Sequence, residues 1–129
     1  MEISIIIFSG ITGALLTFYL NNSLQLGGVM ASAGVSVLAG GLFHLFPDIS
    51  TGYLSNNIPL VVMGCSFIGM ASSRIIKKYW VIAVSGLFFS TIYLLTGSYF
   101  EGFGGSLGTT AAISLCTTFA INQSIKKLK

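Results

Sequence analysis

Hydrophobic positions in this chain form long uncharged blocks, and the charged residues fall only at the boundaries between them. After Glu2, these boundaries are Asp48, the cluster Arg74 to Lys78, Glu101, and the lysines from Lys126 onward. A transmembrane helix needs about 20 consecutive, mostly apolar residues. The first uncharged block is long enough for two such helices, and each of the other three is long enough for one. The pattern therefore predicts five transmembrane helices.

Turn-forming residues locate the breaks between these helices, which we place at 3–20, 26–46, 58–76, 79–97 and 105–123. The polar stretch LNNSLQ divides the first block. FPDISTGYLSNN follows the second helix, and its proline is expected to end that helix. RIIKKYW and the glycine-rich YFEGFGG form the last two breaks. We expect one all-α transmembrane domain over residues 1–129.

The composition agrees with a protein that faces lipid. The chain has 129 residues, of which 53% are hydrophobic and 7% charged, whereas soluble domains carry roughly 25% charged residues. Its mean hydropathy is +0.90. A surface this poor in charge cannot face water on all sides, so the sequence excludes an ordinary soluble domain and predicts an integral membrane protein.

The positions of the cations predict the orientation of the chain. All six lie in the third break or in the C-terminal tail: Arg74, Lys77, Lys78, Lys126, Lys127 and Lys129. With five crossings these places share one side, and cations in short loops stay cytoplasmic. We therefore expect the N-terminus outside and the C-terminus inside, in the bacterial cytoplasmic membrane. The C-terminal lysines are interpreted as an anchor on anionic lipid, not as a nucleic-acid site.

Small residues indicate how the helices pack, because close van der Waals contact holds helices together in lipid. The second helix carries the run GGVMASAGVSVLAGG. Small side chains recur around it, so we expect it to be central. In the third helix, Cys65, Gly69 and Ser73 are spaced by four residues and predict a single close-contact stripe.

An internal repeat is suggested by two segments, 9–34 and 85–112. Both begin with Ser-Gly, contain Tyr-Leu, and enter the following helix through Gly-Gly and a run of small residues. Helices one and two would then be repeated as helices four and five, with the second copy inverted. Inverted repeats are a common construction of secondary transporters. Chance similarity between membrane helices is the alternative.

The stretch that follows Glu101 carries the strongest candidate chemistry. Glycines there let the backbone bend near the start of the fifth helix, where free N–H groups attract a polar solute or an anion. Further along, hydroxyl residues recur every three or four positions and form one polar stripe: Thr110, Ser114, Thr117 and Thr118. They suit a pore lining, or alternatively hydrogen bonds to neighbouring helices and to their own helix.

His44 is the only histidine, and it lies near the expected outer end of the second helix. A histidine side chain can take part in an ion pathway, although a structural histidine is the alternative. Gly27 and Gly28 enter the second helix as the counterpart of the glycines that enter the fifth. The candidate pathway residues are Gly27, Gly28, His44, Glu101, Gly104, Gly105, Ser106, Thr109, Thr110, Ser114 and Thr117.

Catalytic and cofactor motifs are missing from the sequence. One histidine, three acids and two separated cysteines form neither a catalytic set nor a metal motif. We expect no enzyme, no cofactor, no bound metal and no nucleic-acid partner. The sequence predicts a transporter or channel subunit for an ion or small polar solute that acts as a homo-oligomer, with a dimer favoured. The alternative is a non-catalytic scaffold or accessory subunit bound to another membrane protein.

Overall fold

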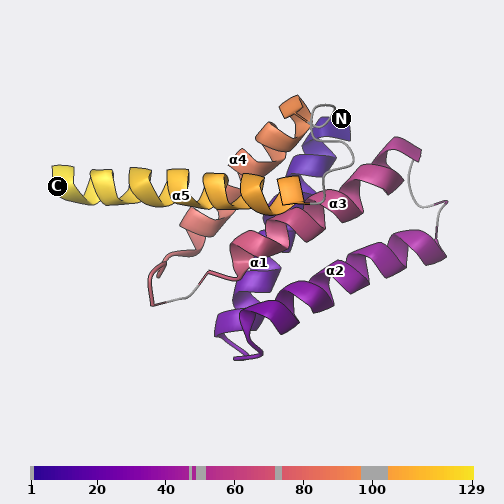
Figure 1. The fold of residues 1–129 in the computed structure, drawn as a ribbon, viewed down its shortest axis with the longest axis horizontal. Helices are drawn as coiled ribbons and strands as arrows, with labels where there is room; N and C mark the ends of the chain where they lie inside the picture. Colours follow the sequence, from indigo (N-terminus) through magenta and orange to yellow (C-terminus); the bar gives the residue numbers. More distant parts are fainter. Residues whose placement is uncertain (1, 47, 49–51, 72–73, 97–104) are drawn as a thin grey trace.

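The computed structural model of the protein describes residues 2–46, 48, 52–71, 74–96 and 105–129. These residues form five helices: α1 (Glu2–Asn22), α2 (Gly28–Leu45), α3 (Gly52–Gly69), α4 (Tyr79–Thr96) and α5 (Gly105–Leu128). Figure 1 shows that successive helices run in alternating directions. The prediction of an all-α protein with five helices is confirmed. The predicted Ser73, Glu101 and Gly104 lie outside the described residues.

Three of the helices, α1, α2 and α4, are long and apolar enough to cross a membrane. This property fits the predicted membrane location. Helix α5 is the longest at 24 residues, but five hydroxyl residues and an amide lie between Thr109 and Asn122, and they lower its mean hydropathy. Helix α3 contains Pro59 and a polar first turn.

Helix α3 differs from its prediction at both ends. The expected range was 58–76, whereas α3 occupies Gly52–Gly69. The segment before Pro59 looks like a loop in the sequence because it contains two asparagines. In the structure, the Asn57 amide donates to the Tyr53 carbonyl at 2.7 Å, and its side-chain oxygen accepts from the Tyr93 hydroxyl at 2.9 Å. These bonds satisfy Asn57 inside a helix.

The early end of α3 is bonded to the end of α1. The Asn21 amide donates to the carbonyls of Gly69, Met70 and Ala71, at 3.4, 3.1 and 3.4 Å. The Asn22 amide donates to Ala71 at 3.2 Å. The last carbonyls of a helix have no partner within the helix, and Asn21 supplies one to Gly69. The other bonds hold the carbonyls of Met70 and Ala71, which directly follow α3. The asparagines that the sequence marks as a turn therefore also fix where α3 stops.

Helix α3, not α2, is the central helix. It contacts α1, α2, α4 and α5, whereas α2 contacts only α1 and α3. The buried residues of α2 are Ala31, Ser32 and Val35. The expectation of a central second helix was wrong, because most of its small residues face outward. Added Cβ atoms at Gly34, Gly40 and Gly41 would meet nothing within 4 Å.

Close contacts through small residues join α1, α3 and α4, and Gly69 of the stripe predicted in the third helix takes part in them. A Cβ at Gly69 would lie 2.7 Å from the backbone nitrogen of Phe18. One at Gly10 would overlap the Ser90 hydroxyl, and one at Gly64 would overlap the Phe89 ring. Only glycine allows these backbones to approach so closely.

The interior of the protein is mostly apolar, but its surface is unusually apolar and several polar side chains are buried. Large apolar residues are exposed, such as Phe8 at 72%, Val37 at 72% and Leu95 at 73%. The buried residues include nine with polar side chains: Thr17, Ser32, Ser66, Ser85, Ser90, Thr110, Ser114, Thr118 and Asn122. No buried side-chain nitrogen or oxygen among the described residues lacks a hydrogen-bond partner. Apolar surface on this scale marks contact with a membrane or with other proteins.

Candidate functional site

The predicted site residues on α5 divide between two faces of that helix. Thr110 and Ser114 are buried, and Thr118 and Asn122 continue the same row with a spacing of four. We call these four residues the polar row. Because α5 contacts only α3 and α4, the polar row lies against those two helices. Asn122 was missed in the sequence, although the spacing of four would have found it.

Two other hydroxyl residues do not belong to the polar row. The sequence placed Thr117 in one stripe with Thr110, Ser114 and Thr118, but Thr117 is exposed on the outer face of α5. The stripe is wrong at this position because α3 and α4 cover only one side of α5. Thr109 is exposed as well.

Every hydroxyl of the polar row donates its hydrogen to α5 itself. The distances are 2.7 Å from Thr110 to the Ser106 carbonyl, 2.8 Å from Ser114 to the Thr110 carbonyl, and 3.0 Å from Thr118 to the Ser114 carbonyl. A hydroxyl that donates in this way still has lone pairs on its oxygen. The row therefore presents acceptors to α3 and α4, and its chemistry suits a cation or a solute that carries N–H or O–H groups.

The start of α5 is open. Gly105 is exposed, and added Cβ atoms at Gly105 and Gly108 would meet nothing within 4 Å. Thr109 donates to the Gly105 carbonyl at 3.0 Å. Because Glu101 and Gly104 lie outside the described residues, the predicted pathway is seen here only from Gly105 onward.

The predicted site residues of α2 lie apart from those of α5, since the two helices make no contact. Gly27 has a φ of 91° and begins α2 in a backbone conformation that favours glycine. A Cβ at Gly28 would lie 3.2 Å from the Met70 Cβ, beside the end of α3. His44 is exposed at the other end of α2. Among the described residues, the predicted residues of α2 and those of α5 therefore do not lie together.

Hydroxyls also link α2 to α3. Ser32 and Ser66 are both buried, and their hydroxyl oxygens lie 2.7 Å apart. Ser36 donates to the Ser32 carbonyl at 2.8 Å and lies 3.4 Å from the Ser66 hydroxyl. This cluster fixes the start of α2 against α3, which is a packing role.

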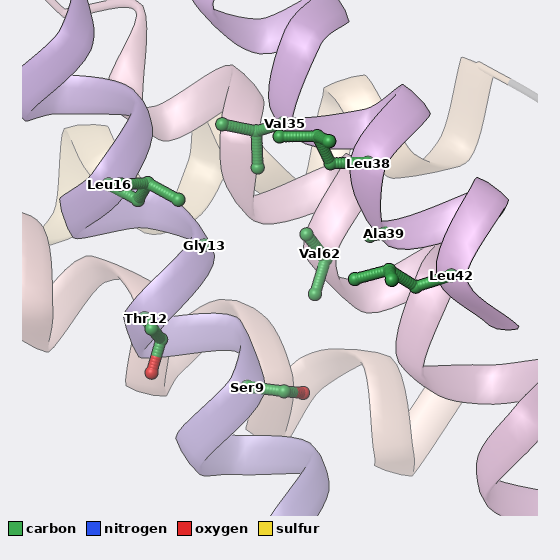
Figure 2. Close-up of a pocket in the computed structure, with 9 residues that line it drawn as sticks. All are labelled: Ser9, Thr12, Gly13, Leu16, Val35, Leu38, Ala39, Leu42 and Val62. Carbon is green, nitrogen blue, oxygen red and sulfur yellow. The ribbon is translucent and has the colours of Figure 1, made fainter. Parts of the chain in front are cut away.

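A groove between α1 and α2 was not predicted. Its volume is about 390 Å³, and Val62 of α3 lies beneath it. Figure 2 shows Leu16 pointing toward α2, and Leu38 and Leu42 pointing toward α1. The sequence signal was weak, because leucine and valine at these positions look like any lipid-facing side chains. The full lining is Ser9, Thr12, Gly13, Leu16, Val35, Leu38, Ala39, Leu42 and Val62.

Comparisons with family models, curated proteins and solved structures gave no match. In the part of the chain that the structure describes, no three His, Cys, Asp or Glu residues are grouped as a metal site. Both cysteines are free, with Cys65 buried in α3 and Cys116 exposed on α5.

Proposed function

We propose that this protein crosses the bacterial cytoplasmic membrane five times and works as a non-enzymatic transporter or channel subunit. Helices α1, α2 and α4 qualify as spans by length and composition. For α5, a membrane-spanning position is supported by which of its faces is buried against the protein. The polar row faces the protein, while Ile113 and Ile121 are exposed at 54% and 42%. A surface helix in water buries its apolar face and exposes its polar face. Helix α5 does the reverse, which suits a hydrocarbon environment.

The orientation of the chain is part of the same proposal, with the N-terminus outside and the C-terminus in the cytoplasm. Figure 1 shows the C-terminus and the segment before α4 on the same side of the molecule. These two places hold all six cations of the chain. Their common side supports a cytoplasmic position for both, because cations in short loops stay in the cytoplasm.

An inverted repeat is supported by the pairing of the helices. If α1 and α2 are exchanged with α4 and α5, α3 stays in place and the set of contacting helix pairs is unchanged. The α1–α3 contact becomes α3–α4, and α2–α3 becomes α3–α5. The α1–α4 contact maps onto itself, as a contact on a two-fold axis does.

The α1–α4 contact follows the same exchange at the level of residues. Aligning Ser9-Gly10 with Ser85-Gly86 also aligns Ala14 with Ser90. A Cβ at Gly10 would meet Ser90, and a Cβ at Gly86 would lie 3.5 Å from the Ala14 Cβ. Gly10 therefore faces Ser90, and Gly86 faces Ala14, which is the residue aligned with Ser90. Reciprocal contacts of this kind support two related halves, a construction common in secondary transporters.

The polar row is the observation that carries the transport proposal. Three hydroxyl oxygens and an amide lie buried in succession along α5, with acceptor lone pairs available. Polar side chains within the membrane mark solute pathways or bind helices together. We propose that they act on a cation or a small donor-bearing solute, and that the functional unit is a homo-oligomer, most simply a dimer, since five helices enclose little space.

Replacing Thr118 with valine tests this role of the polar row. Valine keeps the shape of the side chain but removes the oxygen. We expect the flux of a permeant cation into protein-containing liposomes to fall about tenfold. The variant loses one oxygen contact to the cation, and a contact worth roughly 1.4 kcal/mol corresponds to a factor of about ten. Thr117→Val is the matched control, because Thr117 makes the same bond to its own helix, at 2.7 Å to Ile113, but is exposed. Equal flux in both variants, or no flux above that of empty liposomes, would contradict the proposal.

Cys116 tests whether α5 lies in hydrocarbon. It is exposed on the protein surface, so water would reach it if α5 lay outside the membrane. We expect a charged methanethiosulfonate reagent to leave Cys116 unmodified in intact proteoliposomes and to modify it after solubilisation in SDS. The matched control is a cysteine at Ser124, exposed near the C-terminus, in a protein that carries Cys65→Ala and Cys116→Ala. We expect the reagent to modify that cysteine once it has access to the cytoplasmic side. Rapid modification of Cys116 in intact vesicles would refute a spanning α5.

A second candidate function, a scaffold or accessory subunit, is favoured by the outer face of α2. Gly34, Gly40 and Gly41 leave open space there, and helices in membranes associate through small residues. Purification in mild detergent separates the two candidates. A stoichiometric unlike partner supports the accessory subunit, whereas a stable self-oligomer supports the transporter.

A further inference from the structure

The polar row ends at Asn122, and the next position on the same ridge of α5 is Lys126. Beginning at Thr110, each member of the row is followed four residues later by the next one. Residues four apart form one continuous ridge along a helix. One further step reaches Lys126, about 6 Å beyond Asn122 along the helix axis. A lysine therefore continues the row at its C-terminal end.

Lys126 also lies where the row leaves the interior of the protein. Asn122 is the last buried residue of α5, and every residue after it is exposed. Figure 1 shows this end of α5 extending beyond the other helices. Long side chains on a helix lean toward its N-terminus, so the Lys126 side chain is expected to lead back toward Asn122. Its ammonium group then stands at the opening of the row.

No acidic side chain offsets this charge on the three helices that surround the row. The chain has three acids, Glu2, Asp48 and Glu101, and none of them belongs to α3, α4 or α5. The hydroxyl and amide oxygens of the row are themselves neutral. A cation that moves along the row therefore passes a positive charge at the C-terminal end, and these helices supply no negative charge to balance it.

The neighbouring lysine has the same charge but a different position. Successive residues of a helix are about 100° apart, so Lys127 lies about 100° further round α5 than Lys126. Lys127 is four residues after Gln123, which is exposed, whereas Lys126 is four residues after the buried Asn122. Of these two lysines in the last turn of α5, only Lys126 continues the polar row.

The charge of the solute decides how strongly such a position acts. The Coulomb energy of two charges is proportional to each of them, so a divalent cation is repelled twice as strongly as a monovalent one. The ligands point the same way. Ca²⁺ and Mg²⁺ sites rely on carboxylates, whereas neutral oxygens are sufficient for K⁺ in channels. Both effects favour a monovalent cation in the polar row.

We propose that Lys126 is a specificity-determining residue that makes the polar row select monovalent over divalent cations. Its ammonium group repels each cation that passes the C-terminal end of the row, and it repels a divalent cation more. This inference rests on the proposed function, because it requires the polar row to conduct cations. It gives Lys126 a role that attraction to anionic lipid does not include.

Lys126→Gln tests the proposal by removing the charge at an exposed position. Uptake of Rb⁺ and of Ba²⁺ is measured separately in proteoliposomes of phosphatidylcholine, which lacks the net negative charge that attracts lysines to a membrane. We expect Rb⁺ uptake to rise about threefold, as for loss of a unit charge about 12 Å away at an effective dielectric constant of about 40. Ba²⁺ uptake should start lower in the wild type and rise about tenfold, because the factor for a double charge is the square.

Lys127→Gln is the matched control, because it removes the same charge from another side of α5. It should leave the ratio of Rb⁺ to Ba²⁺ uptake near that of the wild type. Lys126→Arg keeps the charge at the end of the row, so its selectivity should also stay near that of the wild type. A merely structural role of Lys126 would not change the two rates by different factors.

Two outcomes would overturn the selectivity role alone. These are equal effects of Lys126→Gln and Lys127→Gln on the uptake ratio, or a change of Rb⁺ and Ba²⁺ uptake by the same factor in Lys126→Gln. Either can occur while Thr118→Val still lowers cation flux, so failure of this inference is distinguishable from failure of the proposed function. A wild type with no uptake above that of empty liposomes would overturn both.

Discussion

Replacement of Gly69 by alanine is expected to lower the free energy of unfolding by about 3 kcal/mol, at the upper end of the usual cost of overpacking. The added Cβ would lie 2.5 Å from the Thr17 Cβ, 2.7 Å from the Ala14 carbonyl oxygen and 2.7 Å from the Phe18 nitrogen. Two of these atoms belong to the backbone of α1. A side-chain rotation cannot relieve such overlap, so α1 and α3 must move apart.

That separation also weakens the bonds between the asparagines of α1 and the end of α3, because Asn21 donates to the Gly69 carbonyl itself. Unfolding in a graded mixture of mild detergent and SDS, followed by circular dichroism, measures the change. The matched control is Gly41→Ala on α2, where the added methyl meets nothing within 4 Å. The control should be neutral, or more stable by up to roughly 1 kcal/mol because alanine favours the helix. Similar losses in both variants would contradict this account of α1–α3 packing.

Gly64 and Phe89 are expected to behave as a coupled pair. Phe89→Ala leaves a cavity over Gly64 and should cost about 3 kcal/mol, near the low end for buried phenylalanine. The low end applies in the proposed membrane arrangement, because there the ring remains in hydrocarbon when the helices separate. Gly64→Ala should cost about 2 kcal/mol by overpacking, since the new methyl group overlaps the ring of Phe89.

In the double variant, the methyl group added at Gly64 occupies space that the ring has left. We therefore expect the two losses to fall short of additivity by about 2 kcal/mol, a size found for residues in direct contact. The same unfolding measurement applies. Phe88→Ala combined with Gly64→Ala is the control cycle, because Phe88 is the neighbouring ring but is only half-buried and is not among the atoms nearest to Gly64. Additive losses for Gly64 and Phe89 would refute direct contact.

The uncharged blocks were sufficient to predict five helices, because charged and turn-forming residues separate apolar stretches that are each long enough for one helix. They were less informative about α3, where Asn57 and Pro59 look like loop residues. A bond to Tyr93 of α4 satisfies Asn57, and no local pattern predicts a partner so far along the chain. The end of α3 was also misplaced, because it depends on the amides of Asn21 and Asn22 in another helix.

The same limit applies to the candidate site. Spacing of three or four identifies hydroxyls on α5, but neighbouring residues in such a pattern can lie on different faces, and Thr117 and Thr118 do so. Only the positions of α3 and α4 decide which is buried. The abundance of small residues in α2 suggested a central helix, although in the structure Gly34, Gly40 and Gly41 face open space. The groove was not predicted because it depends on Gly13 of α1 lying beside Val62 of α3. The amino-acid composition of each helix does not show which residues of two helices face each other.

The central position of α3 has a consequence for how the chain is made. In the proposed membrane arrangement, a ribosome delivers α1, α2 and α3 to the membrane before α4 and α5 exist. Until those last helices emerge, that arrangement leaves only lipid beside the flank of α3 that carries Gly64, because Phe89 has not yet been synthesised. The first three helices can pair at once, but the bundle closes only at the end of translation.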